Sequence, residues 1–358
     1  MAGPHTVIRG RGAVSNASGR YEPTSREAFD DGWTEADGEP KPLRTELTAE
    51  RARKIISRND SPDVGFSASI NPYRGCEHGC IYCYARPAHA WMGLSPGLDF
   101  ESKLFFKPEA AKLLERELSK PGYLPDPIHI GGNTDPYQPI EKTLRITRSV
   151  LEVLDRFNHP CSIITKNAHI TRDADVLGRM AGRGLTRAFV SVTTLDRKLA
   201  RAMEPRAATP DKRLESIRRL ADAGVPVGVG VAPMIPGLND HEMEAILEAA
   251  AGAGATSAMF ITLRLPLEIK DLFREWLAQA YPDRAERVMS LVRQTRGGKD
   301  YDSEWGSRMK GTGPVAALMA ARFRKATRKF GLNLDRAPLD TAQFRVPAKV
   351  GDQMDFFR

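Results

Sequence analysis

The sequence has 358 residues, of which 41% are hydrophobic, and a formal net charge of +8. This is enough for a sizeable core, and the charge fits either a polyanionic partner or simply an Arg-rich composition. With no apolar run near about eighteen residues and no apolar core of a secretory signal at the first residues, we expect a cytoplasmic protein without membrane contact. Residues 1–60 predict a flexible N-terminal extension with one short helix at 48–56.

From residue 61 onward, short apolar runs alternate with segments of helical spacing. The runs predict strands at 66–70, 127–131, 161–165, 187–193, 225–231 and 257–263. The segments between them predict helices at 108–119, 141–157, 172–184, 209–224 and 240–254. Regular alternation of this kind predicts an α/β fold built on a parallel sheet, with a core domain over 61–265.

The pattern changes after the sixth strand. Residues 268–294 predict an amphipathic helix, the Gly-rich stretch 297–313 follows, and a second helix runs from Pro314 to Phe330. We take 266–332 as a helical C-terminal segment and 333–358 as a tail. The basic side chains of the last helix fit a nucleic-acid backbone or a solvated helix face. Within the tail, Gln353–Phe357 resembles the peptide by which repair and replication proteins dock onto the sliding clamp.

Three of the four cysteines stand within GCEHGCIYCYA, as Cys76, Cys80 and Cys83. Clustered thiols in a reducing compartment more often bind metal than form disulfides. Cys161 begins the third predicted strand, so we expect it at the opposite end of the sheet. Three thiolates with one open position favour a 4Fe–4S cluster, whereas a closed zinc site needs a fourth ligand such as His78. A zinc-stabilised nucleic-acid-binding protein and an electron-transfer protein are the alternatives.

The cysteine spacing, with an aromatic residue before the last thiol, resembles the motif of the radical S-adenosylmethionine (SAM) enzymes over roughly residues 64–265. The resemblance implies a partial (β/α)6 barrel in which the loop after the first strand holds a 4Fe–4S cluster. It also implies that the fourth iron binds SAM, which is cleaved to methionine and a 5′-deoxyadenosyl radical that abstracts hydrogen from a substrate. An external electron donor of the flavodoxin or ferredoxin type is implied as well.

Polar residues follow the predicted strands, where the loops of a parallel barrel meet. A hydroxyl group and a cation suit the methionine end of SAM, and Thr134 and Lys166 fit these roles. GCIYCYA, GGNTDPYQPIE and TKN further resemble the branch around spore photoproduct lyase. That resemblance implies SAM contacts at Thr134, Lys166 and Ser191, with Tyr82 beside the adenine and Tyr84 facing the substrate as the catalytic candidate.

Two further segments supply candidate contacts. Asp135 is expected chiefly to cap the next helix, and Glu204 and Arg206 fit either SAM or a loop salt bridge. The turn IGGNTDPY lacks the hydrogen-donor cysteine of spore photoproduct lyase, so we do not expect repair of that lesion. Nucleic acid is a candidate for the unidentified substrate. The remaining SAM-binding candidates lie in that turn: Gly131, Gly132 and Asn133.

Overall fold

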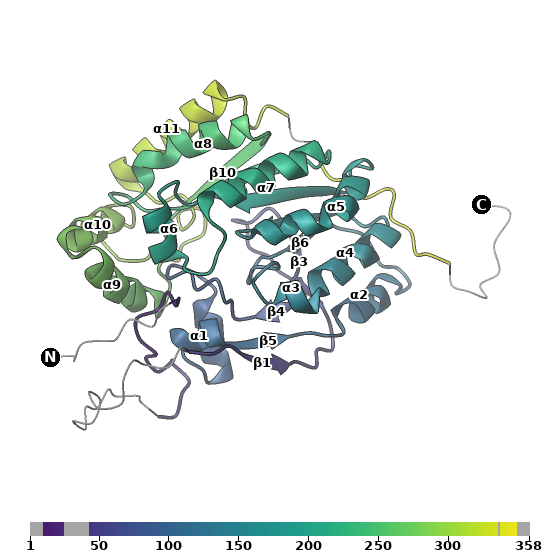
Figure 1. Cartoon of the computed structure of the whole chain (residues 1–358), viewed down its shortest axis with the longest axis horizontal. Coiled ribbons are helices and arrows are strands. Elements are labelled where there is room, and N and C mark those ends of the chain that lie inside the picture. The colour runs from purple at the N-terminus through teal and green to yellow at the C-terminus, as the bar shows by residue number, and fades with distance from the viewer. Residues whose placement is uncertain (1–9, 25–42, 336, 349–358) are drawn as a thin grey trace.

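The computed structural model describes residues 10–24, 43–335 and 337–348, and a largely parallel sheet forms their centre (Figure 1). Its seven strands run in the order β10-β9-β8-β7-β6-β3-β2, and only β2 is antiparallel to its neighbour. Among the described strands, β10 and β2 stand at the two edges and do not pair, so the barrel is open on that side. All six predicted strands are present: β3 (Ala68–Ile70), β6 (Ile128–Ile130), β7 (Cys161–Thr165), β8 (Thr186–Ser191), β9 (Val227–Met234) and β10 (Ser257–Thr262).

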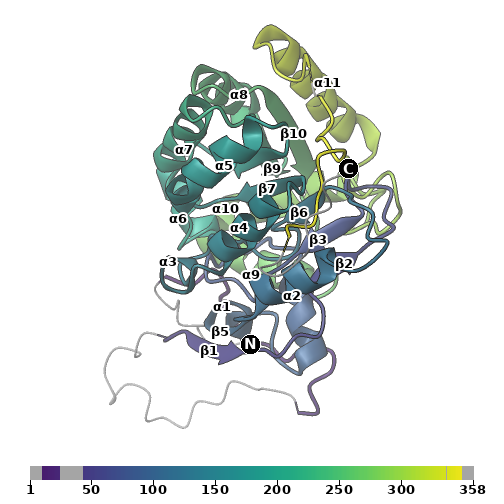
Figure 2. The ribbon, with the colours of Figure 1, turned by 90° about the vertical axis from the view of Figure 1, so that its right-hand side faces the viewer.

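Helices that follow the strands cover one face of this sheet. Neighbouring members of the series α4, α5, α7 and α8 contact one another, and Figure 2 shows them on the same side of the strands. The bounds of these helices are α2 (Ala110–Leu118), α4 (Ile146–Arg156), α5 (Ala174–Ala181), α7 (Pro210–Asp222) and α8 (Met243–Gly252). Shorter elements lie in the loops: η1 (Arg86–Met92), α1 (Leu98–Ser102), η2 (Ala168–Asp173), α6 (Arg197–Met203) and η3 (Asp240–Glu242).

Two predicted helices are each divided in two. The helix expected over 141–157 breaks at Arg145, whose φ of 52° is left-handed, into α3 (Glu141–Leu144) and α4. The helix expected over 268–294 becomes α9 (Ile269–Ala280) and α10 (Pro282–Gln294). Proline lacks an amide N–H and pushes the preceding residue out of the helical region, so Pro282 begins a new helix rather than continuing the first.

The core lies between the sheet and these helices. Aliphatic side chains from successive strands are fully buried there, among them Ile70, Ile130, Ile163, Val190 and Val229. Burial of such side chains contributes roughly 1.5–3 kcal/mol each, and β-branched residues suit the pleated surface. Because these strands are parallel, their carboxyl ends lie at one edge of the sheet, where the loops that follow them meet.

The N-terminal residues that the structure describes are part of the fold, which corrects the expected flexible extension for 10–24 and 43–60. The helix expected at 48–56 is also wrong, because β1 (Glu46–Ala49) and β2 (Ile56–Arg58) lie there. β1 pairs with β5 (Lys103–Phe106), which also pairs with β4 (Tyr73–Arg74). Pairing with distant segments outweighs the local helical preference. Residues 1–9 and 25–42 lie outside the described residues.

The C-terminal segment packs on the barrel through α11 (Gly313–Lys329), which contacts α8 and β10. Arg322 on this helix pairs with Glu244 of α8 at 2.6 Å, so one of its basic side chains holds the helix in place. In the tail, Phe344 packs against His159 and Phe157. The sliding-clamp resemblance at 353–357 lies outside the described residues. None of the helices that the structure describes has the length and apolar character needed to cross a bilayer.

Candidate functional site

The three cysteines lie on the loop that leaves β4, close to the end of β3. Cys76 and Cys80 are buried and Cys83 is half-buried. The loop turns sharply because Gly75 and Gly79 adopt left-handed φ values of 73° and 67°, a conformation that glycine adopts without steric cost. In the described part of the chain, no three His, Cys, Asp or Glu side chains are gathered as ligands of one metal ion.

The thiols share one electrostatic environment. Burial raises the pKa of all three, and the charges of Asp135 and Cys80 raise that of Cys76 further. The ammonium of Lys166 acts in the opposite direction on both Cys80 and Cys83. Three neighbouring thiols, of which two belong to buried residues, together with a cation that favours the thiolate form of Cys80 and Cys83, fit a group that binds thiolates.

Side chains outside the loop hold its main chain in place. Gln138, which is fully buried, accepts a hydrogen bond from the amide of Glu77 at 3.0 Å and donates to the carbonyl of Gly75 at 3.2 Å. Arg86 donates to the carbonyl oxygens of Cys80 at 2.9 Å and Gly79 at 3.1 Å. Contacts within the protein therefore hold the main chain of the loop in place.

His78 does not face the thiols. Its Nδ1 lies 3.3 Å from a carboxylate oxygen of Asp135, and its Nε2 lies 3.1 Å from the amide nitrogen of Asn167. Both ring nitrogens are therefore directed at the loops after β6 and β7. This geometry does not supply the fourth ligand that a closed zinc site would require.

Asp135 joins three loops rather than only capping a helix. Its carboxylate accepts hydrogen bonds from the Thr165 hydroxyl at 2.6 Å, the Lys166 amide at 2.7 Å and the Tyr137 amide at 2.9 Å. Burial alone would raise its pKa, but His78 and these donors outweigh burial and hold the pKa at about 2. Asp135 therefore stays ionised and positions Lys166.

The turn after β6 contacts the cysteine loop directly. The hydroxyl of Tyr84 donates to the carbonyl of Gly132, and Thr134, which is buried, donates to the carbonyl of Tyr73 at 3.1 Å. Gly131 has a φ of 98°, and a Cβ there would lie 2.7 Å from the carbonyl oxygen of Ile164. Any larger residue at position 131 would clash with that oxygen, which explains why a glycine is found there. The same turn is fixed by the amide of Asn133, which donates to the side chain of Asn71 at 2.8 Å.

Tyr82 and Glu204 form a second buried group beside the loop. The Tyr82 hydroxyl donates to Glu204, and the Lys166 ammonium lies 5.7 Å from the centre of the Tyr82 ring. Thr193 also donates to Glu204, at 2.7 Å. The other carboxylate oxygen pairs with Arg213, which is 2% exposed. Both oxygens of Glu204 therefore hold protein groups.

Ser191 ends β8 and is buried, opposite Gly230 of β9. Its carbonyl accepts a hydrogen bond from Arg213 at 3.1 Å. Arg206 pairs with Glu77 of the cysteine loop at 3.2 Å, which is the loop salt bridge expected as one of two roles. Sequence reasoning missed Arg213, because a basic residue near the start of an amphipathic helix looks like a surface residue.

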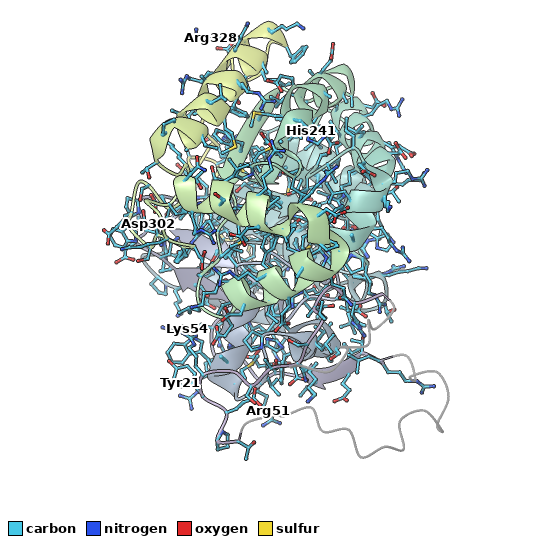
Figure 3. The ribbon with its side chains drawn as sticks, turned by 90° about the vertical axis from the view of Figure 1, so that its left-hand side faces the viewer. Tyr21, Arg51, Lys54, His241, Asp302 and Arg328 are labelled. Carbon is cyan, nitrogen blue, oxygen red and sulfur yellow. The ribbon has the colours of Figure 1, made fainter. Side chains whose placement is uncertain are left out.

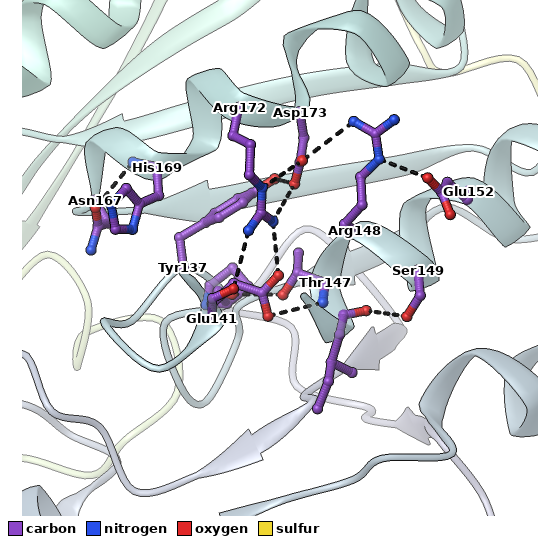
Figure 4. A network of polar contacts seen from close by, with 12 residues as sticks. Tyr137, Glu141, Thr147, Arg148, Ser149, Glu152, Asn167, His169, Arg172 and Asp173 are labelled. Atoms are coloured by element: carbon purple, nitrogen blue, oxygen red, sulfur yellow. Dashed lines mark hydrogen bonds and ion pairs between the residues drawn. The ribbon is translucent and has the colours of Figure 1, made fainter. Parts of the chain in front are cut away.

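A network of ion pairs and hydrogen bonds supports the turn after β6 (Figure 4). Arg172 lies between Glu141 and Asp173, at 2.9 Å from each. Glu141 also accepts the hydroxyl of Tyr73, while Tyr137 donates to Asp173 at 3.0 Å. Both carboxylates are fully buried, so pairing offsets the cost of burying their charge.

The structure therefore brings the candidates together at the carboxyl edge of the sheet: Tyr82, Tyr84, Thr134 and Lys166 with the three cysteines, and Ser191 at the end of the adjoining β8. Cys161 is at the other end of β7, as expected, and its thiol lies 3.5 Å from the Thr186 hydroxyl.

Comparisons with known proteins find relatives of this chain. An uncharacterised protein of Mycobacterium tuberculosis (strain ATCC 25618 / H37Rv) is 34% identical over 231 residues, 64% of this chain and 68% of that protein. An uncharacterised protein of Methanocaldococcus jannaschii is 27% identical over 247 residues, 68% of this chain and 87% of the relative.

Among solved structures, spore photoproduct lyase complexed with dinucleoside spore photoproduct superposes with a TM-score of 0.56 at 18% identity, over 80% of each chain. A variant of that lyase with bound AdoMet gives 0.53 at 17% identity, again over 80% of each chain. This likeness shows the fold. The model of the radical SAM superfamily matches residues 70–250. Because that match extends from the end of β3 to α8, the chain belongs to the radical SAM superfamily.

Proposed function

We propose that Cys76, Cys80 and Cys83 hold a 4Fe–4S cluster and that Thr134, Lys166 and Ser191 bind SAM beside it. The proposal depends chiefly on one observation: the three cysteines lie within one loop whose main chain Gln138 and Arg86 hold in place, and the charge of Lys166 acts to lower the pKa of two of the thiols. When bound, the cluster supplies the electron that cleaves SAM to methionine and a 5′-deoxyadenosyl radical. An external donor of the flavodoxin or ferredoxin type would provide that electron.

Side chains of this protein fit the amino and carboxylate groups of the methionine moiety. Thr134 uses its proton on the Tyr73 carbonyl, which leaves its lone pairs to accept from an ammonium group. Lys166, held in place by Asp135, would pair with the carboxylate. The ring of Tyr82 would line the adenine side, with Glu204 fixing its hydroxyl. Gly132 would let the backbone approach the cofactor closely, and Gly131 and Asn133, fixed by their contacts with β7 and Asn71, would position the same turn against it.

Tyr84 is the catalytic candidate. It directly follows Cys83, its side chain is 49% exposed, and its hydroxyl is held by Gly132. Such a side chain would face a substrate while staying next to the cluster loop. Spore photoproduct lyase, which shares the fold, has a structure in complex with dinucleoside spore photoproduct, so nucleic acid is the first substrate class to test.

The test is anaerobic reconstitution with iron and sulfide, followed by dithionite and SAM and measurement of 5′-deoxyadenosine. Wild type should retain about four iron per chain and release 5′-deoxyadenosine, whereas Cys76→Ala should do neither. Cys161→Ala is the matched control, because this thiol lies at the far end of β7 and should change neither result. Zinc in place of iron, or a cluster that never cleaves SAM, would refute the proposal. Repeating the assay with UV-irradiated DNA tests the substrate class.

A further inference from the structure

Arg264 lies at the rim of the proposed site, just beyond the end of β10. Its guanidinium carbon is 5.5 Å from the centre of the Tyr84 ring. Tyr84 comes from the cysteine loop, which leaves β4 close to the end of β3, so the two residues belong to segments near opposite edges of the open sheet. A cation beside an exposed aromatic ring near the cluster loop is placed to contact a substrate rather than to support the core.

The side chain of Arg264 has weak partners. Its Nη1 lies 3.4 Å from the sulfur of Met309, and its Nη2 lies 3.4 Å from the hydroxyl of Tyr301. Its Nε is buried and has no hydrogen-bond partner among the described residues. Within that same part of the chain, no carboxylate is within ion-pair distance of Arg264. An arginine presents five donors in a planar fork, and here most of that capacity is unused.

A second guanidinium adds to the positive charge. Arg296 is 2% exposed and donates only to main-chain carbonyls, among them Leu263 at 2.6 Å and Arg308 at 2.9 Å. Burial lowers the pKa of Arg296, and the charge of Arg264 lowers it further, so the two cations are close enough to repel. Two guanidinium groups therefore lie close together at this rim, and Asp302 offsets part of the charge of Arg296.

The nearby carboxylates already contact other groups of the protein. Asp63 pairs with Arg308, and Asp300 pairs with Arg274 at 2.7 Å. Asp302 accepts from the Ser307 hydroxyl at 2.6 Å, and Figure 3 shows it at the periphery of the molecule. Asp63 interacts electrostatically with Arg264, but its oxygens contact Arg308 and the amide of Gly306, so Arg264 forms no direct ion pair among the described residues.

The Gly-rich stretch 297–313 completes the site. It runs beside β10, where the amide of Thr262 donates to the carbonyl of Met309 at 3.0 Å. It also reaches the connection between β2 and β3, because Arg308 pairs with Asp63 and the amide of Gly306 donates to the same carboxylate at 2.7 Å. The stretch thus joins the two edges of the open barrel beside Arg264.

We propose that Arg264 binds an oxyanion of the substrate, so that the substrate carries a phosphate or carboxylate next to the group that faces Tyr84. The planar guanidinium fork matches either group, and both would neutralise the charge that the protein leaves unpaired. The inference rests on the proposed function, because it assumes that substrate enters at Tyr84.

The test measures binding to the reconstituted full-length protein by calorimetry, without reductant. The probes are inorganic phosphate, acetate and the dinucleoside monophosphate TpT. Arg264→Gln should weaken binding about tenfold to a hundredfold, and Arg264→Lys should weaken it less. Arg287→Gln, at an exposed position of α10, is the matched control and should bind as wild type does. Thermal melting of each variant separates lost binding from lost folding.

The three probes distinguish a substrate that carries a phosphate from one that carries a carboxylate. Loss of TpT and phosphate binding in Arg264→Gln supports the inference with a phosphate substrate, and loss of acetate binding alone supports it with a carboxylate. A folded Arg264→Gln that binds every probe as tightly as wild type overturns it, as does a wild type that binds none. Because no SAM cleavage is required, a wild type that binds TpT but never releases 5′-deoxyadenosine would refute only the proposed function.

Discussion

Arg86 and Glu101 form an ion pair in which both side chains are fully buried. The pair stands behind the cysteine loop, because Arg86 also holds the carbonyl oxygens of Gly79 and Cys80. The Glu101 carboxylate accepts the amides of Gly12 at 2.9 Å and Ala13 at 2.8 Å as well. One carboxylate therefore joins the N-terminal segment to the loop that carries the thiols.

Glu101→Gln should destabilise the protein by about 3–5 kcal/mol, because it leaves the Arg86 charge buried without a counterion. The free energy of unfolding, measured with urea, checks this. Glu109→Gln removes an exposed carboxylate that pairs with Lys112 at 3.5 Å, and should cost no more than about 1 kcal/mol. Equal effects of the two substitutions would show that the buried pair is not what holds the loop.

The close approach of Gly12 to the loop gives a second prediction. A Cβ at Gly12 would overlap the carbonyl oxygen of Gly79, so Gly12→Ala should push the N-terminal segment off the loop. We expect faster proteolysis of the N-terminal segment and poorer retention of iron after reconstitution. Gly65→Ala is the control, since no atom lies within 4 Å of a Cβ there. If the variant is cleaved faster at its N-terminus but retains iron normally, the N-terminal segment does not contribute to cluster binding.

The parts of the fold that follow from the sequence are those specified by local patterns. Strands such as β7 and β8 are short runs with β-branched residues between polar turns, and α7 begins at Pro210, one residue after the predicted start, with the proline in its first turn. The cysteine motif is local too, since all three thiols lie within one loop. These features depend on residues that are close together in the chain, so the sequence alone predicts them.

The parts that the sequence did not reveal depend on distant contacts. Arg11 donates to the carbonyl of Glu101, 90 positions away, and nothing near Arg11 indicates that partner. Arg213 looks like a surface residue of an amphipathic helix, yet it is buried against Glu204. Such residues can be identified only when the fold brings their partners together.

Lys166 supplies a third prediction, on SAM binding. Lys166→Met keeps most of the aliphatic stem but removes the charge proposed to pair with the SAM carboxylate, so affinity for SAM should fall about tenfold to a hundredfold. Equilibrium binding of labelled SAM to the reconstituted protein measures this, with iron content determined in parallel. Lys198→Met changes an exposed lysine at the start of α6 and should leave affinity unchanged. Undiminished SAM binding in Lys166→Met would remove Lys166 from the site.

A fourth prediction concerns stability at mildly acidic pH and rests on His159. Its Nδ1 lies 3.0 Å from the carbonyl of Pro160 and its Nε2 lies 2.9 Å from the hydroxyl of Tyr123. In this arrangement Nδ1 donates and Nε2 accepts, so the ring is neutral, and a second proton would remove the acceptor. Burial lowers its pKa from 6.5 to about 4.

The unfolded chain binds this proton near pH 6.5 and the folded chain only near pH 4, so stability falls as the pH drops through that window. Between pH 7.5 and 5 the loss from this one group should be about 2 kcal/mol. Because Gln can donate and accept at the same site, His159→Gln should unfold in urea with a smaller difference between the two pH values, by that amount. His241→Gln, at an exposed position labelled in Figure 3, serves as the control and should keep the wild-type difference. If His159→Gln loses as much stability as wild type between the two pH values, the folded protein binds this proton as readily as the unfolded chain does.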